Sequence, residues 1–335
     1  MVNFKNNISL LPYNTFGIDV KTSSFIQVKK TDDLLNAFKK KSFENFLVIG
    51  QGSNILFTED FPGLTILMDN HGKKVIEENQ KEVIVEIQSG ENWHEFVLWC
   101  LKNNYGGVEN LALIPGKVGG APIQNIGAYG VEIKDVFLTC NTLEISTLTY
   151  KEFNLKECDF RYRDSVFKSE LKGKYIITSV TLKLQKYPHT VNLEYGNLKN
   201  MLKDKEKTIQ NIAESIIKIR SSKLPDPKII GNCGSFFKNP IILKSKLKDL
   251  KKTFKEVPFY PHTKDKIKIP AAWIIEKLGF KGYNENSVGV YKNHSLVLIN
   301  HGNAKGKDVK ILAEKIRSKV FDSFSISLEY EVNVC

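Results

Sequence analysis

Residues 114–130, with the sequence IPGKVGGAPIQNIGAYG, restrict the possible folds of this chain more than any other segment. They contain five glycines and two prolines in seventeen residues, together with Ile, Val and Ala. Proline interrupts helices and strands, and glycine permits backbone conformations that other residues avoid. The apolar residues nevertheless indicate burial. A buried glycine-rich loop suits contact with a flat or polyanionic ligand, although a structural Ω-loop explains the pattern equally well.

A second glycine-rich loop follows an apolar run in FLVIGQGSNILF, residues 46–57. Where side chains are missing, backbone N–H groups can approach a phosphate, and this loop offers Gly50, Gly52, Ser53 and Asn54. Ile55 replaces the third glycine of the dinucleotide-binding GxGxxG pattern, and the residues from Ile55 onward favour a strand rather than a helix. The loop is therefore either an anion-binding turn or a plain hairpin turn.

The spacing of apolar residues predicts an α+β fold. A chain of 335 residues has the length of about two or three domains. Short apolar runs bounded by glycine and polar residues predict strands at 46–49, 64–68, 83–87 and 175–184. Apolar residues three and four positions apart predict helices at 93–101, 209–216, 270–278 and 308–320. The irregular segment 185–207 is a candidate domain boundary.

Composition excludes several protein classes. The chain is 41% hydrophobic, with 20 Phe and 12 Tyr, which is too apolar for a disordered chain. No apolar run approaches the ~18 residues of a membrane span, and no signal peptide is recognisable, so we expect a cytoplasmic protein without membrane insertion. The five cysteines are scattered without a CxxC or Cys/His cluster, and we therefore expect neither disulfides nor a bound metal.

The formal net charge of +12 comes mostly from lysine, because only Arg161, Arg163, Arg220 and Arg317 are arginines. The planar Arg side chain, rather than Lys, is the usual bidentate reader of bases and phosphates. The lysines are spread along the chain in short clusters, which favours a solvated surface over a nucleic-acid site. We therefore expect a general attraction for anionic small molecules and no nucleic-acid partner.

Three other segments carry reactive side chains. FRYRDSVFK places Arg161 and Arg163 beside an acid, where they either bind an anion or form a surface ion pair. GNCGSFFKNP presents Ser235 after a glycine turn and before two Phe, without a GxSxG motif. Such a hydroxyl can donate a proton to a carbanion-like centre, although a serine in a turn is usually only a turn residue. The closing ISLEYEV predicts a half-buried strand with Glu329 and Glu331 on one face.

Taken together and in order, these segments closely resemble the UDP-N-acetylenolpyruvoylglucosamine reductase family. The resemblance covers nearly the whole chain and is carried by NTFG at 14–17, GQGSN, IPGKVGGAPIQNIGAYGVE, YRDS, SKLPDP, GNCGSFFKNP, PAAWIIE and the closing EYEV. It implies noncovalent FAD in a fold of the vanillyl-alcohol-oxidase type, with NADPH as co-substrate. The flavin would carry the redox chemistry, while the protein supplies position and electrostatics.

The resemblance also implies a domain arrangement. FAD-binding subdomains would occupy residues 1–70 and 71–222, with the FAD-binding region at about 17–187 and a tyrosine loop at about 188–206. A substrate-binding domain would follow at 223–324, and a C-terminal strand at 325–335 would return Glu331 to the active site. By the same resemblance, the FAD contacts are Gly50, Gly52, Ser53, Asn54, Ile114, Pro115, Gly116, Gly119, Gly120, Gln124, Asn125, Gly127, Ala128 and Tyr129.

The catalytic roles of the family fall on Arg163, Ser235 and Glu331. The implied reaction reduces UDP-N-acetylglucosamine enolpyruvate to UDP-N-acetylmuramate, in peptidoglycan precursor synthesis. NADPH would reduce FAD, and flavin N5 would then give hydride to the enolpyruvyl methylene carbon. Arg163 would bind the substrate carboxylate, a protonated Glu331 would hydrogen-bond it, and Ser235 would deliver a proton to the adjacent carbon.

Further substrate contacts are implied at other positions of the motifs. They are Tyr129, Tyr195, Lys223, Asn239 and His294. Tyr195 in LEYGNL resembles the tyrosine loop of one of the two types of this enzyme. The family usually carries Arg after the Glu-Val pair, whereas this chain has Asn333, and Cys233 has no role in the motifs. By analogy with the family we expect a monomer.

Three alternatives remain open at this point. Another FAD oxidoreductase of the same fold, such as a lactone or sugar-alcohol oxidase, commonly tethers its flavin through His or Cys, and neither glycine-rich loop contains His. A basic nucleic-acid-binding protein would be colourless and would bind polyanions with steep salt dependence. An inactive relative would have lost the catalytic residues, whereas this chain has Arg163, Ser235 and Glu331.

Overall fold

The computed structural model describes residues 3–194 and 198–335, which form two compact units. Unit 1 consists of Met1–Ile8, Thr22–Gln51 and Phe61–Arg220. Unit 2 consists of Ser9–Lys21, Gly52–Asp60 and Ser221–Cys335. Two short segments near the N-terminus therefore belong with the C-terminal part of the chain, and each unit is described by itself.

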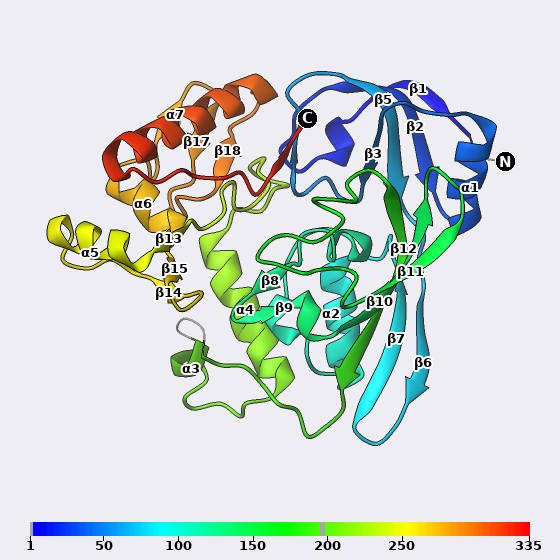
Figure 1. Cartoon of the computed structure of the whole chain (residues 1–335), viewed down its shortest axis with the longest axis horizontal. Helices are drawn as coiled ribbons and strands as arrows, with labels where there is room; N and C mark the ends of the chain where they lie inside the picture. Colours follow the sequence, from blue (N-terminus) through cyan, green and yellow to red (C-terminus); the bar gives the residue numbers. More distant parts are fainter. Residues whose placement is uncertain (1–2, 195–197) are drawn as a thin grey trace. The chain divides into compact units, whose positions relative to one another are not determined.

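The first layer of unit 1 is a four-stranded sheet in the order β1-β2-β5-β3 (Figure 1). Its strands are β1 (Lys5–Ser9), β2 (Lys21–Val28), β5 (Phe61–Met68) and β3 (Phe46–Ile49). β2 and β3 both pair parallel to β5. Parallel neighbours need a crossover connection, and the helix α1 (Thr31–Lys40) lies between β2 and β3 in the chain. Its Leu34 and Ala37 pack with Ile26, Leu64 and Ile66 of the sheet in one buried cluster.

The second sheet of unit 1 has five antiparallel strands in the order β11-β10-β12-β7-β6. The strands are β6 (Lys73–Glu78), β7 (Glu82–Gln88), β10 (Phe137–Glu144), β11 (Tyr150–Asn154) and β12 (Tyr175–Gln185). The helices α2 (Trp93–Lys102) and α4 (Ile209–Lys223) contribute buried side chains to the same core, and the short helix α3 (Leu198–Met201) adds Leu198.

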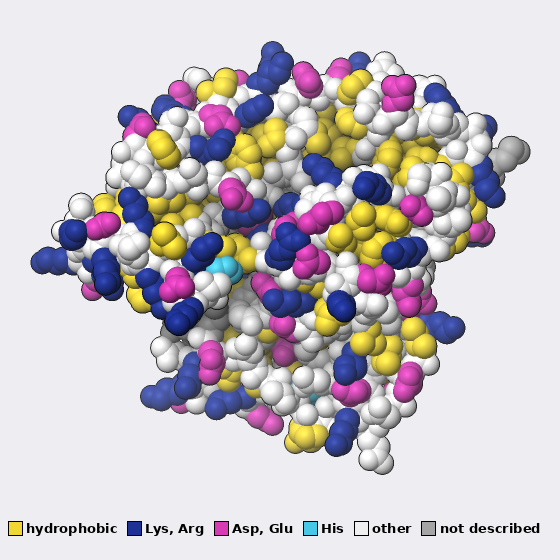
Figure 2. Space-filling view, viewed as in Figure 1, with side chains coloured by type: hydrophobic (Ala, Val, Ile, Leu, Met, Phe, Trp, Pro, Cys, Tyr) yellow, Lys and Arg dark blue, Asp and Glu magenta, His cyan; other side chains and the backbone are white. Residues whose placement is uncertain are grey.

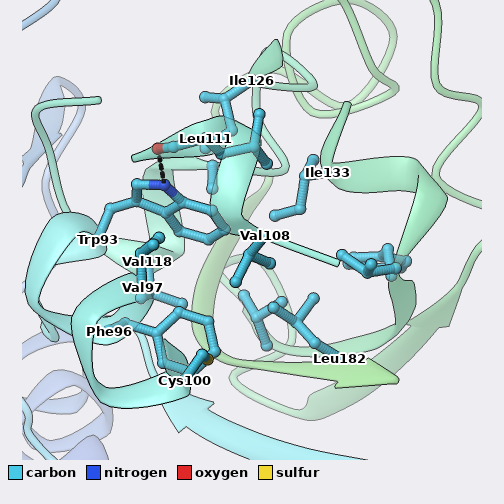
Figure 3. Close-up of a cluster of buried hydrophobic side chains, with 14 of the residues drawn as sticks. Trp93, Phe96, Val97, Cys100, Val108, Leu111, Val118, Ile126, Ile133 and Leu182 are labelled. Carbon is cyan, nitrogen blue, oxygen red and sulfur yellow. Dashed lines mark hydrogen bonds between the residues drawn. The ribbon is translucent and has the colours of Figure 1, made fainter. Parts of the chain in front are cut away.

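The core beside α2 fixes the start of the glycine-rich stretch. Trp93 is buried and donates from Nε1 to the carbonyl oxygen of Leu111 at 3.0 Å (Figure 3). α2 itself begins at a capped end, because the side chain of Asn92 accepts a hydrogen bond from the N–H of Glu95. The indole and the cap therefore hold the chain that enters residues 114–130 in one position.

Unit 2 contains two small three-stranded sheets and three helices. The sheets are β13-β15-β14 and β16-β17-β18, formed by Ile241–Leu243, Lys266–Lys268, Tyr260–Pro261, Asn284–Glu285, Val288–Val290 and Leu298–Asn300. The helices are α5 (Lys244–Thr253), α6 (Ala271–Lys277) and α7 (Gly306–Phe324). β4 (Ile55–Leu56) and β19 (Asn333–Val334) pair parallel, which ties the chain end to the segment after the first glycine loop.

Most predicted elements are present, with three differences. The predicted helices correspond to α2, α4, α6 and α7, and the predicted strands correspond to β3, β5, β7 and β12. α1 was not predicted, and α6 begins at Ala271 with Pro270 as its N-cap residue. The alternating burial of ISLEYEV is present, but regular strand pairing covers only Asn333–Val334 because the preceding residues make isolated backbone contacts instead of a ladder.

The described residues also bear on the expectations about membranes and metals. Among residues 3–194 and 198–335, no helix is both long enough and apolar enough to cross a membrane. The same ranges contain no group of three or more His, Cys, Asp or Glu side chains arranged to hold a metal ion. On the face drawn in Figure 2, Lys and Arg side chains are scattered among acidic ones rather than gathered in one patch.

Candidate active site

The glycine-rich stretch of unit 1 is held by hydrogen bonds from both sides. It forms a 3₁₀ turn at Val118–Gly120 and a hairpin of β8 (Gly127–Ala128) and β9 (Val131–Glu132). Gly116 donates its N–H to Gln51 Oε1 at 2.8 Å and accepts from the N–H of Trp93 at 3.0 Å. A Cβ at Gly119 would lie 2.5 Å from Cβ of Ser89, whereas a Cβ at Gly120 would meet nothing within 4 Å. The backbone is therefore packed on one side and open on the other.

The remaining residues of this stretch have different environments. Asn125 is fully buried, and its side chain donates to Glu132 Oε2 at 2.8 Å and to the carbonyl oxygen of Arg161 at 3.0 Å. Asn125 therefore shapes the loop from inside. Gln124 Oε1 accepts from Lys168 Nζ at 3.5 Å. Among the other predicted contacts in the stretch, Pro115 is exposed. The remaining ones pack against the core, and they are Ile114, Ala128 and Tyr129.

The first glycine loop is divided between the units. Gly50 and Gln51 belong to unit 1, where a Cβ at Gly50 would lie 2.5 Å from Cγ of Lys117. Gly52 belongs to unit 2, has φ +60°, and a Cβ there would lie 2.1 Å from the carbonyl oxygen of Tyr13. A larger residue at either position would displace the backbone or side chain that it meets. Ser53 is half-buried.

Arg163 sits on a tight turn in unit 1. The backbones of Arg161 and Asp164 bond to each other in both directions, and Arg163 has φ +55°, which non-glycine residues rarely adopt. Its Nη2 donates to the carbonyl oxygen of Gly127 at 2.6 Å, and its Nη1 lies 3.0 Å from the place of a Cβ on Gly127. Glycine at 127 therefore allows the guanidinium to approach the glycine-rich stretch.

Arg161 differs from Arg163 although only one residue separates them. Arg161 is exposed and forms ion pairs with Asp159 and Glu170. The surface ion pair considered for this segment thus describes Arg161, whereas Arg163 is directed toward Gly127. The two arginines provide a natural pair for mutational comparison.

Ser235 and Glu331 lie on neighbouring segments of unit 2. The N–H of Phe236 donates to the carbonyl oxygen of Leu296 at 2.8 Å, and the N–H of Glu331 donates to the carbonyl oxygen of Phe236 at 2.9 Å. Ser235 follows Gly234, which has φ +73°, and pairs with Val297 in an isolated bridge. The backbone thus brings residues 96 positions apart in the chain, from Ser235 to Glu331, into adjacent segments.

Aromatic rings and hydrogen bonds surround this pair of segments. Phe236 and Phe237 are fully buried, and the ring of Phe236 meets those of Phe16 and Tyr330 edge-on at centroid distances of 6.3 and 5.4 Å. The carbonyl oxygen of Glu331 accepts from Asn54 Nδ2 at 3.3 Å. Glu331 is therefore anchored through its backbone on two sides, next to the buried rings of Phe236 and Phe237.

Comparison with known proteins decides which family has these features. Residues 226–335 match the model of the C-terminal domain of UDP-N-acetylenolpyruvoylglucosamine reductase, and residues 22–148 match the model of an FAD binding domain. The chain is 47% identical to the UDP-N-acetylenolpyruvoylglucosamine reductase of Flavobacterium johnsoniae, over 98% of this chain and 99% of the relative. This chain belongs to the UDP-N-acetylenolpyruvoylglucosamine reductase family.

Two further similarities agree with this assignment. The reductase of Amoebophilus asiaticus is 45% identical over 99% of both chains. The crystal structure of UDP-N-acetylenolpyruvylglucosamine reductase from Thermus caldophilus has a TM-score of 0.69 and 19% identity, and the match covers 100% of this chain and 98% of that one. The predicted α+β fold with an FAD-binding region is thereby confirmed. The protein is an oxidoreductase of this family, with FAD as its cofactor.

Unit 1 of this reductase contains features that fit FAD. Asn110 Oδ1 and Arg220 Nε are shielded from solvent without a hydrogen-bond partner among the described residues. Asn110 also donates from Nδ2 to the carbonyl oxygen of Tyr129 at 2.9 Å, so it lies beside the glycine-rich stretch. Buried polar atoms without partners are rare in native proteins and call for a ligand, water or ion. A flat cofactor with hydrogen-bonding edges would provide such partners.

Arg220, like Asn110, is a candidate site residue that sequence reasoning missed. It is one of four arginines and immediately precedes the SSKLPDP segment, but nothing in the sequence shows that its Nε is shielded from solvent. Burial lowers the pKa of the Arg220 guanidinium, Tyr129 raises it, and Arg163 lowers it. The surroundings of Arg220 in the structure therefore indicate a binding site, whereas its position in the sequence does not.

The predicted substrate contacts of unit 2 have varied surroundings. Lys223 is exposed at the end of α4. Asn239 Oδ1 accepts from the N–H of Ala271 at 2.8 Å and so caps α6. His294 is half-buried, and its Nδ1 accepts from the N–H of Leu296 at 3.3 Å. Tyr195 lies outside the described residues.

Cys233 is fully buried beside the proposed catalytic carboxylate. Burial raises the pKa of the Cys233 thiol well above its usual range, and Glu331 raises it further. Since the thiolate is the reactive form of cysteine, Cys233 is an inert packing residue near Glu331. This placement gives Cys233 a structural position that its sequence motif did not indicate.

Proposed function

We propose that this protein reduces UDP-N-acetylglucosamine enolpyruvate to UDP-N-acetylmuramate with NADPH, in peptidoglycan precursor synthesis. FAD, when bound, carries the hydride from NADPH to the enolpyruvyl double bond. The proposal rests on family membership and on one structural observation in particular. Ser235 and Glu331 lie on segments joined by a backbone hydrogen bond in unit 2.

Each proposed catalytic side chain has a role that follows from the negative charge that develops on the substrate. Addition of hydride to the methylene carbon leaves negative charge on the neighbouring carbon and its carboxylate. Arg163 binds this carboxylate through its guanidinium, whose planar fork suits bidentate pairing. The rare backbone conformation of Arg163 and its bond to Gly127 support a fixed orientation for that role.

Ser235 completes the reaction by donating its hydroxyl proton to the carbon that carries the developing charge. The buried Phe236 and Phe237 next to it support this assignment, because a site shielded from water strengthens the electrostatics of proton transfer. A protonated Glu331 hydrogen-bonds the substrate carboxylate. Its two backbone anchors, to Phe236 and Asn54, hold it in position.

The remaining roles are also part of the proposal. Residues 50–54 and 115–130 contact FAD, and Lys223, Tyr195 and Asn239 contact the substrate, with Lys and Tyr suited to its diphosphate. The domain limits follow those expected from the family, with FAD-binding subdomains at 1–70 and 71–222, the tyrosine loop at about 188–206, a substrate domain at 223–324 and the chain end at 325–335. We further propose a monomeric cytoplasmic enzyme.

Product analysis tests this function. The protein is incubated without oxygen with FAD, NADPH and UDP-N-acetylglucosamine enolpyruvate, and the sugar nucleotide is examined by mass spectrometry. We expect a product that has gained one hydride and one proton. If NADPH is oxidised only when oxygen is admitted and the sugar nucleotide stays unchanged, the protein is an oxidase of the same fold and the proposed function is wrong.

A further inference from the structure

Arg220 is a half-buried cation in unit 1 to which the proposed mechanism gives no role. It lies in α4, and its Nε is shielded from solvent without a hydrogen-bond partner among the described residues. Burying a charge without a partner is costly, so buried charges in proteins are normally paired. A guanidinium whose Nε is shielded from solvent and has no partner among the described residues is therefore a candidate to bind an anionic ligand.

The neighbours of Arg220 do not supply a negative charge. In the described part of the chain, Tyr129 and Arg163 are the groups that act on its pKa besides burial itself. Arg220 also acts on His94, whose pKa is lowered mainly by burial, so this imidazole is neutral at neutral pH. The cluster thus contains two guanidiniums together with a neutral imidazole and a phenol.

Packing places this end of α4 near the glycine-rich stretch, because Ile219, directly before Arg220, packs against the same hydrophobic cluster as Tyr129. His94 Nδ1 accepts from the N–H of Leu113, directly before the stretch, at 3.1 Å. Tyr129 lies near the other end, and Arg163 donates to Gly127 between them. Under the proposed function this stretch contacts the isoalloxazine ring. The ring gains negative charge on reduction, delocalised over N1 and the C2 carbonyl, and a planar guanidinium is suited to bind such a delocalised anion.

We propose that Arg220 binds the edge of the isoalloxazine ring that becomes negatively charged on reduction, and thereby raises the reduction potential of FAD. The inference rests on the proposed function, which places the flavin at this stretch. It gives the two neighbouring guanidiniums different roles, because Arg163 binds the substrate carboxylate whereas Arg220 stabilises the reduced cofactor. Charge near N1 and N5 is one of the main ways a protein tunes a flavin.

Sulfite titration of the FAD-loaded protein tests Arg220 without NADPH or sugar. Sulfite forms a bond from sulfur to N5 of oxidised flavin, and the displaced electron pair moves onto N1 and the C2 carbonyl. The bleached adduct therefore carries the same negative charge as the reduced ring. In Arg220→Met we expect the sulfite Kd to rise about tenfold or more. We also expect a lower midpoint potential, by about 30 mV for a tenfold change in a two-electron couple.

Two variants serve as controls. Arg220→Lys keeps a positive charge without the planar fork and should give an intermediate sulfite Kd. Arg161→Met removes an exposed arginine of the same unit and should change the sulfite Kd by less than about twofold, because exposed ion pairs are worth little. All titrations are made at saturating FAD, so a weaker cofactor affinity does not hide the result.

Three results would overturn the inference. The first is an unchanged sulfite Kd and potential in FAD-loaded Arg220→Met. The second is an equal shift in Arg161→Met, which would indicate only a general effect of charge. The third is weaker FAD binding with normal sulfite affinity, which would assign Arg220 to the pyrophosphate. None of these concerns the sugar substrate, so a failure of the proposed function would appear separately, as normal sulfite binding without product formation.

Discussion

The two units hold different kinds of candidate active-site residues. Unit 1 contributes cations: Arg163 on a tight turn with φ +55°, and Arg220, whose Nε is shielded from solvent. Unit 2 contributes a hydroxyl and a carboxylate, Ser235 and Glu331, on neighbouring backbone segments beside buried aromatic rings. Under the proposed function, recognition of negative charge depends on oriented guanidiniums in unit 1, whereas proton delivery depends on two paired backbone segments in unit 2.

The two units also differ in backbone strain, because Arg163 has a left-handed conformation and Ser235 does not. A non-glycine residue in the left-handed region costs about 1–3 kcal/mol and persists only where the surroundings enforce it. For Arg163, the paired backbones of Arg161 and Asp164 and the bond to Gly127 provide that enforcement. Ser235 needs no such conformation because Gly234, with φ +73°, makes the turn before it.

The largest expected effect separates proton delivery from cofactor reduction. Ser235→Ala should still bind FAD and be reduced by NADPH at the normal rate. Reoxidation by the enolpyruvyl sugar should slow by about 10²- to 10⁴-fold, because general acid catalysis typically contributes that much. Stopped-flow absorbance measures the two half-reactions separately, and an equal loss in both would contradict the role of Ser235.

The next effect compares the two neighbouring arginines of unit 1. Arg163→Met should lower kcat/KM for the sugar. The expected loss of transition-state stabilisation is about 2–5 kcal/mol, because the substitution removes one partner of a buried charge pair. Arg161→Met should leave kcat/KM almost unchanged, because its ion pairs are exposed. Steady-state kinetics of the purified variants provide the measurement. Similar losses in both variants would show that the turn as a whole, and not Arg163, matters.

A smaller effect is expected at Glu331. Glu331→Gln keeps a hydrogen-bond donor for the substrate carboxylate, so we expect a loss of about tenfold in sugar reduction, the equivalent of one weakened hydrogen bond. Glu329→Gln is the matched control, because Glu329 is exposed and two residues away. If the control loses as much activity as Glu331→Gln, the assignment of the catalytic carboxylate fails.

The smallest effect concerns pH and the cation cluster of unit 1. Burial holds the pKa of His94 below its ordinary value of 6.5, so the folded state binds fewer protons there than the unfolded state does. Its contribution to stability is therefore complete above pH 6.5 and is lost as the pH falls below that value. Protonation also removes the acceptor for the N–H of Leu113.

Thermal unfolding between pH 7.5 and about 5 checks this prediction. His94→Gln should lose less stability over that range than the wild type, because the group that titrates is gone. The exposed His262 offers a control, and His262→Gln should behave like the wild type. If His94→Gln loses as much stability as the wild type over this pH range, groups other than His94 cause the loss.

Local sequence patterns predicted much of the fold. The helices α2, α4 and α7 carry long apolar stripes, and β3, β7 and β12 are bounded apolar runs, so each pattern determines its element. α1 was missed because its ten residues contain many charges and its apolar face becomes clear only against the sheet. The joining of residues 9–21 and 52–60 to unit 2 depends on contacts distant in sequence, which no local pattern encodes.

The candidate site was predictable to a different extent in each unit. The motifs singled out Arg163, Ser235 and Glu331, and the structure adds the reason that Arg163 and Arg161 differ, namely the bond to Gly127. Arg220 has no signal beyond its residue type, because the shielding of its Nε without a partner is a property of tertiary packing. In the same way, the capping role of Asn239 requires knowledge of where α6 begins.

The most direct test of the central claim is the visible absorption spectrum of the purified, FAD-loaded protein during two anaerobic additions. NADPH is added first, and UDP-N-acetylglucosamine enolpyruvate follows. We expect the flavin bands to bleach with NADPH and to return fully with the sugar nucleotide. Bands that bleach but do not return would contradict the proposed substrate, and a protein that retains no flavin after excess FAD has been removed by gel filtration would contradict the cofactor as well.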